Sequence, residues 1–278
     1  MARTKTAQAE VPESRKNTFL EILEAIVIAL VLAFVIRTFA VQAFKIPSGS
    51  MIPTLLIGDH ILVNKFLFGM QLPLLSDRIL TIRKPARGDV LVFKFPKDHR
   101  TDYIKRLVGE PGDRIEIVND KIFVNGNHWE SDPGQYEGGR RSDWRQSGNE
   151  SRFGPIYIPR KGDVVQLENG ALLINNESIE IPEGKIIDEG NLRDYYDVFY
   201  ANLFSPGIGP RAHSTSDPLV IEEDRYLMVG DNRDNSRDGR FWGLVRDSEV
   251  RGKAFIIYWS WNRENHGVRW SRVGDVVD

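Results

Sequence analysis

The segment that says most about this chain is Ile46-Pro47-Ser48-Gly49-Ser50-Met51-Ile52-Pro53-Thr54-Leu55. Two serines flank a glycine between two prolines, a composition typical of a turn. A serine on such a turn is accessible and can lie close to backbone N–H groups. A nucleophile that attacks a carbonyl and must stabilise an oxyanion has these two requirements. Ser50 is therefore the candidate nucleophile, although a serine that only caps the turn fits this segment equally well.

A long apolar segment lies immediately upstream, almost entirely apolar over 22–41 and uninterrupted over 25–36. A spanning helix needs about 20 mainly apolar residues, so 22–41 is predicted to be a transmembrane anchor. Arg3, Lys5, Arg15 and Lys16 favour a cytoplasmic N-terminal tail (1–21) and an exported remainder. A cleavable secretory signal is the alternative, because Val41-Gln42-Ala43 resembles a processing site. The long, glutamate-containing N-terminal stretch and the closeness of that site to Ser50 argue against it.

Downstream of the serine turn, the sequence has the patterning of β-strands. No helical periodicity extends past the anchor, so we expect the exported part to be all-β with antiparallel sheets. Hairpin turns are predicted at Asn125-Gly126 and Asn175-Asn176. The predicted strands include 60–66, 89–95, 114–118, 121–124, 226–229 and 253–259.

The composition excludes several kinds of site. The 278 residues contain no cysteine, which excludes disulfides, thiol nucleophiles and cysteine-based zinc sites. The five histidines are scattered without ligand spacing, so neither a metal site nor a cofactor is predicted. A net charge of −2 gives no electrostatic footprint for nucleic acid. Because no histidine is suggested as a base, a lysine becomes the simpler partner for a catalytic serine.

Two further segments contain candidate catalytic residues. Tyr103-Ile104-Lys105-Arg106-Leu107-Val108-Gly109-Glu110-Pro111-Gly112-Asp113 places a lysine inside a strand-like run. Free lysine has a pKa near 10.4 and is a poor base at neutral pH, but burial would lower that pKa toward about 7–8. Lys105 is the candidate general base, with an ordinary edge-strand lysine as the alternative. Arg106 points to the opposite face of the strand and is expected to be solvated. The second segment, Gly230-Asp231-Asn232-Arg233-Asp234-Asn235-Ser236-Arg237-Asp238-Gly239-Arg240, is denser in polar residues than a turn requires.

Together these segments and the apolar anchor resemble bacterial type I signal peptidase, the serine–lysine leader peptidase family. The resemblance covers the anchor, about 44–113 and 226–259. It implies a signal-peptidase-like β fold and a membrane-bound serine endopeptidase that cleaves N-terminal signal peptides from exported preproteins after small residues (Ala-x-Ala). The implied catalytic core is 42–124 and 223–278, with an inserted β domain at 125–222. The implied location is the cell membrane, in a single pass, with the catalytic part on the exported side.

The same resemblance assigns roles to individual residues. Ser50 would attack the scissile carbonyl and form an acyl-enzyme, with Lys105 as its base. The oxyanion would be bound by the Ser50 backbone N–H and the Ser48 hydroxyl, and Ser236 would orient the lysine. The walls of the pockets for small substrate side chains would be Phe44, Ile46 and Ile104.

The remaining polar residues of the segment 230–240 are expected to form a scaffold around this loop. Gly239 departs from the family, which commonly has serine there, and is expected to loosen the loop slightly. The expected scaffold residues are Asp231, Asn232, Arg233, Asp234, Asp238 and Arg240.

The predicted partners are signal-peptide-bearing preproteins and membrane lipids, and the chain is expected to function as a monomer. The apolar run 66–75 and the pair Trp259 and Trp261 are either interfacial or part of the core. Two other functions remain as alternatives. A self-cleaving transcriptional repressor would need a helix-turn-helix where this chain has its apolar segment. A membrane-anchored adaptor without turnover would be expected to lack Ser50 or Lys105, and both are present.

Overall fold

The computed structural model describes residues 18–35, 41–69, 78, 80–119, 121–135, 152–168, 171–178 and 218–278. It divides into two compact units, 1–40 and 41–278.

The described part of the first unit is one helix, α1 (Thr18–Val35), which has neither glycine nor proline. Glu21 and Glu24 lie near its start, and apolar side chains such as Leu30 are exposed along it. Within the ranges that the structure describes, no helix is both long enough and apolar enough to cross a membrane. The anchor predicted over 22–41 includes 36–40, which lie outside the described residues, and it stays a prediction.

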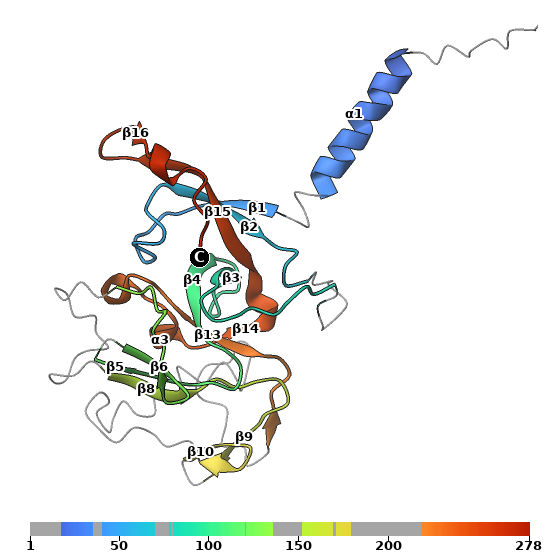
Figure 1. Cartoon of the computed structure of the whole chain (residues 1–278). Helices are drawn as coiled ribbons and strands as arrows, with labels where there is room; N and C mark the ends of the chain where they lie inside the picture. Colours follow the sequence, from blue (N-terminus) through green and yellow to red (C-terminus); the bar gives the residue numbers. More distant parts are fainter. Residues whose placement is uncertain are drawn as a thin grey trace, which may run out of the picture. The chain divides into compact units, whose positions relative to one another are not determined.

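The second unit is built on an antiparallel sheet of eight strands (Figure 1). The strand order is β1-β2-β15-β3-β4-β13-β14, with β16 paired to β15. Every pairing is antiparallel, which confirms the predicted all-β class for this part of the chain. The strands are β1 (Val41–Lys45), β2 (Asp59–Asn64), β3 (Val90–Lys94), β4 (Asp102–Gly109), β13 (Arg225–Val229), β14 (Val245–Arg246), β15 (Val250–Asn262) and β16 (Gly267–Val268).

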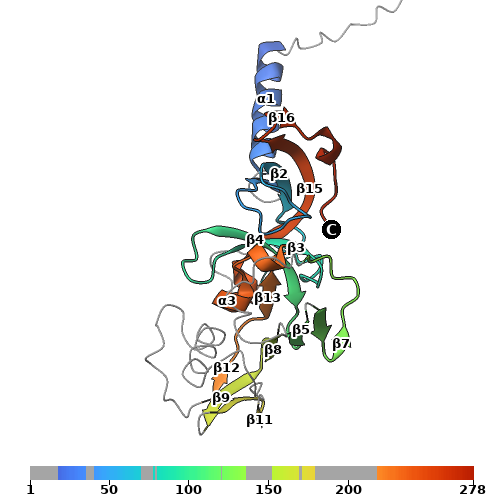
Figure 2. The ribbon, with the colours of Figure 1, turned by 90° about the vertical axis from the view of Figure 1, so that its left-hand side faces the viewer.

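The described residues of this unit also form two four-stranded sheets, and Figure 2 shows them on the side of β13 away from β2. The predicted hairpin turns at Asn125-Gly126 and Asn175-Asn176 are confirmed by positive φ angles and by strand pairing across them. One sheet has the order β7-β6-β5-β8, from β5 (Arg114–Val118), β6 (Lys121–Val124), β7 (Asn127–His128) and β8 (Arg152–Tyr157). The other has the order β11-β10-β9-β12, from β9 (Val164–Glu168), β10 (Ala171–Ile174), β11 (Glu177–Ser178) and β12 (Leu219–Val220).

The boundary between sheets does not coincide with the domain boundary predicted at 125. β5 and β6, assigned to the catalytic core, pair with each other, and β5 also pairs with β8, which lies in the predicted insertion. The change of sheet therefore falls between β4 and β5. The division into catalytic core and inserted domain stays a prediction.

Four short helices follow β13, where no helix was expected. They are η3 (Arg233–Asn235), α3 (Gly239–Trp242), η4 (Asp247–Glu249) and η5 (Trp270–Arg272). Each is a single turn, too short to leave a helical period in the sequence. α3 begins where the Asp238 carboxylate accepts a hydrogen bond from the Arg240 N–H, which satisfies one of the helix's unpaired donors.

Three clusters of buried side chains form the core. One lies beneath the serine turn and includes Ile46, Met51 and Leu55. A second, rich in aromatic residues, packs Phe93 and Trp242 together between β3 and α3. The third joins β13 to the two four-stranded sheets. The serine turn and the lysine strand are thus each anchored by their own apolar contacts.

Candidate active site

The predicted nucleophile and base lie next to each other. Ser50 sits in the turn between β1 and β2, and Lys105 lies in the middle of β4, 55 positions away in the sequence. Lys105 Nζ donates a hydrogen bond of 2.6 Å to Ser50 Oγ. Ser50 is 9% exposed and Lys105 is 4% exposed. This geometry suits proton transfer from the hydroxyl to a neutral amine.

Burial lowers the pKa of Lys105 to about 8, because an apolar site disfavours the ammonium form. Asp238 and Asp231 oppose this shift, and Arg240 adds to it. Nζ also donates to the Ile104 carbonyl at 2.9 Å. The lysine therefore lies close to the pKa range that the sequence required of a working base.

Asn232 holds the backbone of the serine turn. The Ser50 carbonyl accepts a hydrogen bond of 3.1 Å from the Asn232 N–H, and the Gly49 carbonyl accepts one from the Asn232 side chain at 3.2 Å. Among the described residues, no backbone carbonyl accepts from the Ser50 N–H. The Ser48 side chain is exposed. The role of the Ser50 N–H and the Ser48 hydroxyl as oxyanion donors stays a prediction.

The three predicted pocket residues belong to one apolar cluster. Ile46 is buried, and Phe44 and Ile104 are partly buried against the cluster that contains it. Phe44 lies on β1 and Ile104 on β4, next to Lys105. The structure brings the three residues together beside the serine turn, and their role as substrate pocket stays a prediction.

Ser236 lies beside the site, and none of the described residues forms a hydrogen bond with its hydroxyl. It is 4% exposed and close enough to Asp238 to help lower the pKa of that carboxyl, although the geometry falls short of a hydrogen bond. A Cβ added to Gly230 would lie 2.1 Å from Ser236 Oγ and 2.5 Å from the Ser50 carbonyl oxygen. Glycine is therefore required at 230 for these two segments to meet. The lysine-orienting role of Ser236 stays a prediction.

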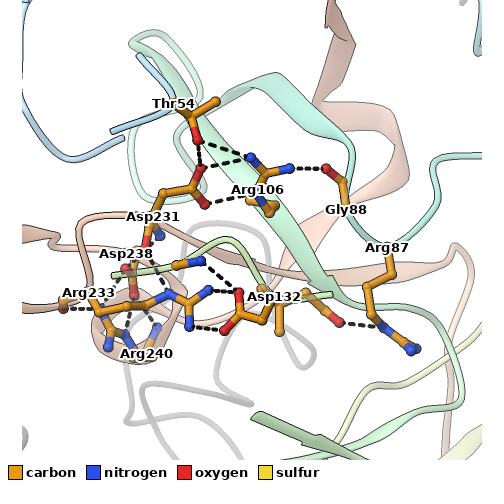
Figure 3. Close-up of polar contacts among 12 residues, drawn as sticks. Thr54, Arg87, Gly88, Arg106, Asp132, Asp231, Arg233, Asp238 and Arg240 are labelled. Carbon is orange, nitrogen blue, oxygen red and sulfur yellow. Dashed lines mark hydrogen bonds and ion pairs between the residues drawn. The ribbon is translucent and has the colours of Figure 1, made fainter. Parts of the chain in front are cut away.

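The expectation that Arg106 is solvated is wrong. Arg106 is 2% exposed, and its Nε and Nη2 donate to the two carboxylate oxygens of Asp231 at 2.8 Å each (Figure 3). Thr54 Oγ1 donates to the same carboxylate at 2.6 Å, and Arg106 also donates to the Gly88 and Asp278 carbonyls. The alternation of faces along β4 was predicted correctly. Both faces of β4 are covered by other segments at this point, so the face that carries Arg106 is buried as well.

A second buried ion pair organises the loop 230–240. Arg240 and Asp238 are joined at 2.8 Å with both side chains fully buried (Figure 3). Burial alone would raise the pKa of the Asp238 carboxyl, but Arg240 and the Gly230 N–H lower it below its usual value. Arg240 also donates to the Arg233 carbonyl at 2.7 Å. The predicted scaffold of hydrogen bonds and ion pairs is present.

Gly239 lies in close contact with β13, and the expectation that it loosens this loop stays a prediction. A Cβ at this position would lie 2.7 Å from the Met228 carbonyl oxygen and 2.9 Å from Leu227 Cδ1. The missing side chain therefore allows α3 to pack directly on β13.

Sequence reasoning missed one group of residues beside the site, the segment 129–135. Its Asp132 pairs with Arg233, and its Gln135 pairs with the backbone around Asn232. No pattern in the sequence singles these residues out. Among the described residues, no group of three or more His, Asp and Glu is placed to hold a metal ion.

Known proteins are similar to this chain over most of its length. The model of the family "signal peptidase, peptidase S26" matches residues 19–154 and 158–259. Signal peptidase I of Buchnera aphidicola subsp. Acyrthosiphon pisum is 32% identical, covering 97% of this chain and 86% of its own. The Pseudomonas aeruginosa signal peptidase I is 32% identical, covering 89% and 75%. A crystal structure of a signal peptidase I from Enterococcus faecalis covers 62% of this chain and 97% of its own, at 18% identity. Its TM-score of 0.31 is too low to carry an argument about the fold.

Proposed function

The chain belongs to the signal peptidase family, peptidase S26, and we propose that it cleaves exported preproteins with Ser50 as nucleophile and Lys105 as general base. As a member of this family it is a serine peptidase that removes signal peptides. The observation that carries the assignment of these two residues is the contact of 2.6 Å between a buried lysine of lowered pKa and the serine hydroxyl.

The reaction follows from the positions of these groups. Neutral Lys105 takes the proton of Ser50 Oγ as that oxygen attacks the scissile carbonyl. The oxyanion accepts hydrogen bonds from the Ser50 N–H and the Ser48 hydroxyl. Lys105 then gives its proton to the leaving amine, and an acyl-enzyme remains on Ser50. In the second half, Lys105 takes a proton from the water that attacks the acyl carbonyl. The ester bond to Ser50 Oγ then breaks as the Lys105 ammonium returns a proton to that oxygen, and the signal peptide leaves with a new carboxyl group that ionises in water.

Small residues at the −1 and −3 positions of the substrate fit the cluster beside Ser50. Ile46 is buried and would form the back of the pockets, while Phe44 and Ile104 are only partly buried and would face the substrate. We propose that these apolar walls accept alanine and exclude larger side chains.

The membrane location is part of the same proposal. A single-pass anchor at 22–41 with a cytoplasmic N-terminus would place residues 42–278 on the exported side. Trp259 and Trp261 are 36% and 37% exposed, which would suit contact with membrane lipids. Most of the apolar run 66–75, namely 70–75, lies outside the described residues. We propose that the protein acts as a monomer on signal-peptide-bearing preproteins.

The full chain in detergent is expected to cleave a fluorogenic peptide after Ala-x-Ala. Replacing the −1 alanine by leucine should lower kcat/KM by about 10- to 100-fold, because overfilling an apolar pocket costs about 1–3 kcal/mol. Cleavage is followed by fluorescence, with Ser50→Ala as the control for contaminating peptidases. Absence of Ser50-dependent cleavage would favour the adaptor alternative.

The activity should fall as the pH is lowered. Lys105 acts as a base only when neutral, and its pKa in the free enzyme is lowered to about 8. We therefore expect kcat/KM to rise tenfold per pH unit below about 8 and to level off above it. The measurement is initial rate against pH at low substrate concentration. A profile that stays flat down to the pH of acid unfolding would contradict the role of Lys105.

A further inference from the structure

The segment 129–135 follows β7 and runs beside the catalytic loop, defined here as residues 230–240. Gln135 and Asn232 form a parallel β-bridge. The Gln135 N–H donates to the Asp231 carbonyl at 2.8 Å, and the Arg233 N–H donates to the Gln135 carbonyl at 2.9 Å. Residues that lie about a hundred positions apart in the sequence thus meet through backbone hydrogen bonds.

On the side away from Gln135, Asn232 contacts the serine turn. Its backbone N–H donates to the Ser50 carbonyl, and its side-chain amide donates to the Gly49 carbonyl. Asn232 therefore lies between Gln135 on one side and Ser50 on the other. A displacement of residue 135 would be passed through Asn232 to the backbone of the nucleophile.

An ion pair and a close packing contact fix this arrangement. The Asp132 carboxylate accepts hydrogen bonds from both terminal nitrogens of Arg233, one of them at 2.7 Å (Figure 3). Arg233 is fully buried, and its Nε donates to the Gly230 carbonyl at 3.1 Å. The Gly134 N–H donates to Asp132, and a Cβ at Gly134 would lie 2.1 Å from Arg233 Cζ. Gly134 thus lets the backbone lie directly against the guanidinium.

We propose that Asp132 and Gly134 are positioning residues of the catalytic centre, acting through Arg233 and Asn232 on Ser50. This inference rests on the proposed function of Ser50 and Lys105. It gives a positioning role in catalysis to a segment that the family resemblance placed in the inserted region.

The proposal predicts a specific kinetic signature. Loss of the ion pair between Asp132 and Arg233 would shift the Ser50–Lys105 geometry. A misplacement of about 1 Å can lower the rate about 10²-fold. KM should change little, because none of the described members of the apolar cluster with Phe44 and Ile104 comes from 129–135. The acidic limb should keep its position, because Asp132 is not among the groups that shift the pKa of Lys105.

The test uses the full chain in detergent with the Ala-x-Ala peptide. Asp132→Asn is expected to lower kcat by about 10- to 100-fold with KM within about twofold, and Asp132→Glu should restore part of the loss. Gly134→Ala should have a similar effect while keeping the carboxylate. The matched control for Asp132 is Asp113→Asn, because Asp113 pairs with Arg87 and its side chain is also 11% exposed. Gly267→Ala is the control for Gly134, since a Cβ there meets only Asn265 O at 3.7 Å.

The outcomes are separable. The inference is overturned if Asp132→Asn and Gly134→Ala match their controls in kcat, or if the loss of kcat equals the unfolded fraction measured by circular dichroism. It is also overturned if the loss appears in KM alone. A wild-type chain whose cleavage does not depend on Ser50 would instead refute the proposed function itself.

Discussion

Replacing Ser50 or Lys105 by alanine is expected to abolish turnover. Without the serine hydroxyl no acyl-enzyme forms, and without the amine the hydroxyl loses the base that contacts it. Each single variant should lose on the order of 10⁴- to 10⁶-fold in kcat. The double variant should be hardly worse than either single one, because the two groups act as one unit joined by a contact of 2.6 Å.

The measurement is single-turnover cleavage of the Ala-x-Ala peptide, with circular dichroism to verify the β fold of all three variants. A Lys105→Ala protein that keeps most of its activity would show that another group takes the Ser50 proton. Two single losses that multiply in the double variant would show that the residues act independently.

Breaking the buried pair between Arg106 and Asp231 is expected to give the largest loss of stability. Asp231→Asn leaves the charge of Arg106 buried and unpaired, with 2% of that side chain exposed. The expected cost is about 3–5 kcal/mol in the free energy of unfolding. The melting temperature of a chain of this size would fall by on the order of 10 °C.

Urea unfolding followed by tryptophan fluorescence measures this cost. Lys84→Met provides the contrast: Lys84 pairs with Asp224 at 2.8 Å, but its side chain is 78% exposed, so its loss should cost about 1 kcal/mol or less. The combined Arg106→Met and Asp231→Leu variant should recover part of the loss, since no buried charge remains. Equal effects of Asp231→Asn and Lys84→Met would contradict the account of a buried pair.

The parts of the fold that the sequence predicts well are those governed by local patterns. Strands at 114–118 and 121–124 have the predicted bounds, because alternation and the Asn125-Gly126 turn are local properties. The contact between Ser50 and Lys105 was predicted from motif resemblance and not from periodicity. No local rule brings a turn after β1 to a strand 55 positions later.

Predictions that depended on packing between distant segments were the ones that failed. Arg106 was expected in solvent because a strand with alternating polarity usually has one wet face. The loop at Asp231 and the turn at Thr54 cover that face, and neither is visible from β4 alone. The pairing of Asp132 with Arg233 likewise depends on the path of the chain after β7.

Because Lys105 is buried, the free energy of unfolding also depends on pH in the alkaline range. Its pKa is about 8 in the folded chain and 10.5 in the unfolded reference, so the unfolded chain binds more protons between these two values. The contribution of this lysine to the free energy of unfolding therefore rises with pH from about 8 to about 10.5. Below pH 8 the folded protein bears the full cost of keeping a charged Lys105 buried, about 3 kcal/mol in the free energy of unfolding for a shift of this size. For this one group, the protonation state that permits catalysis is also the one that the fold accommodates best.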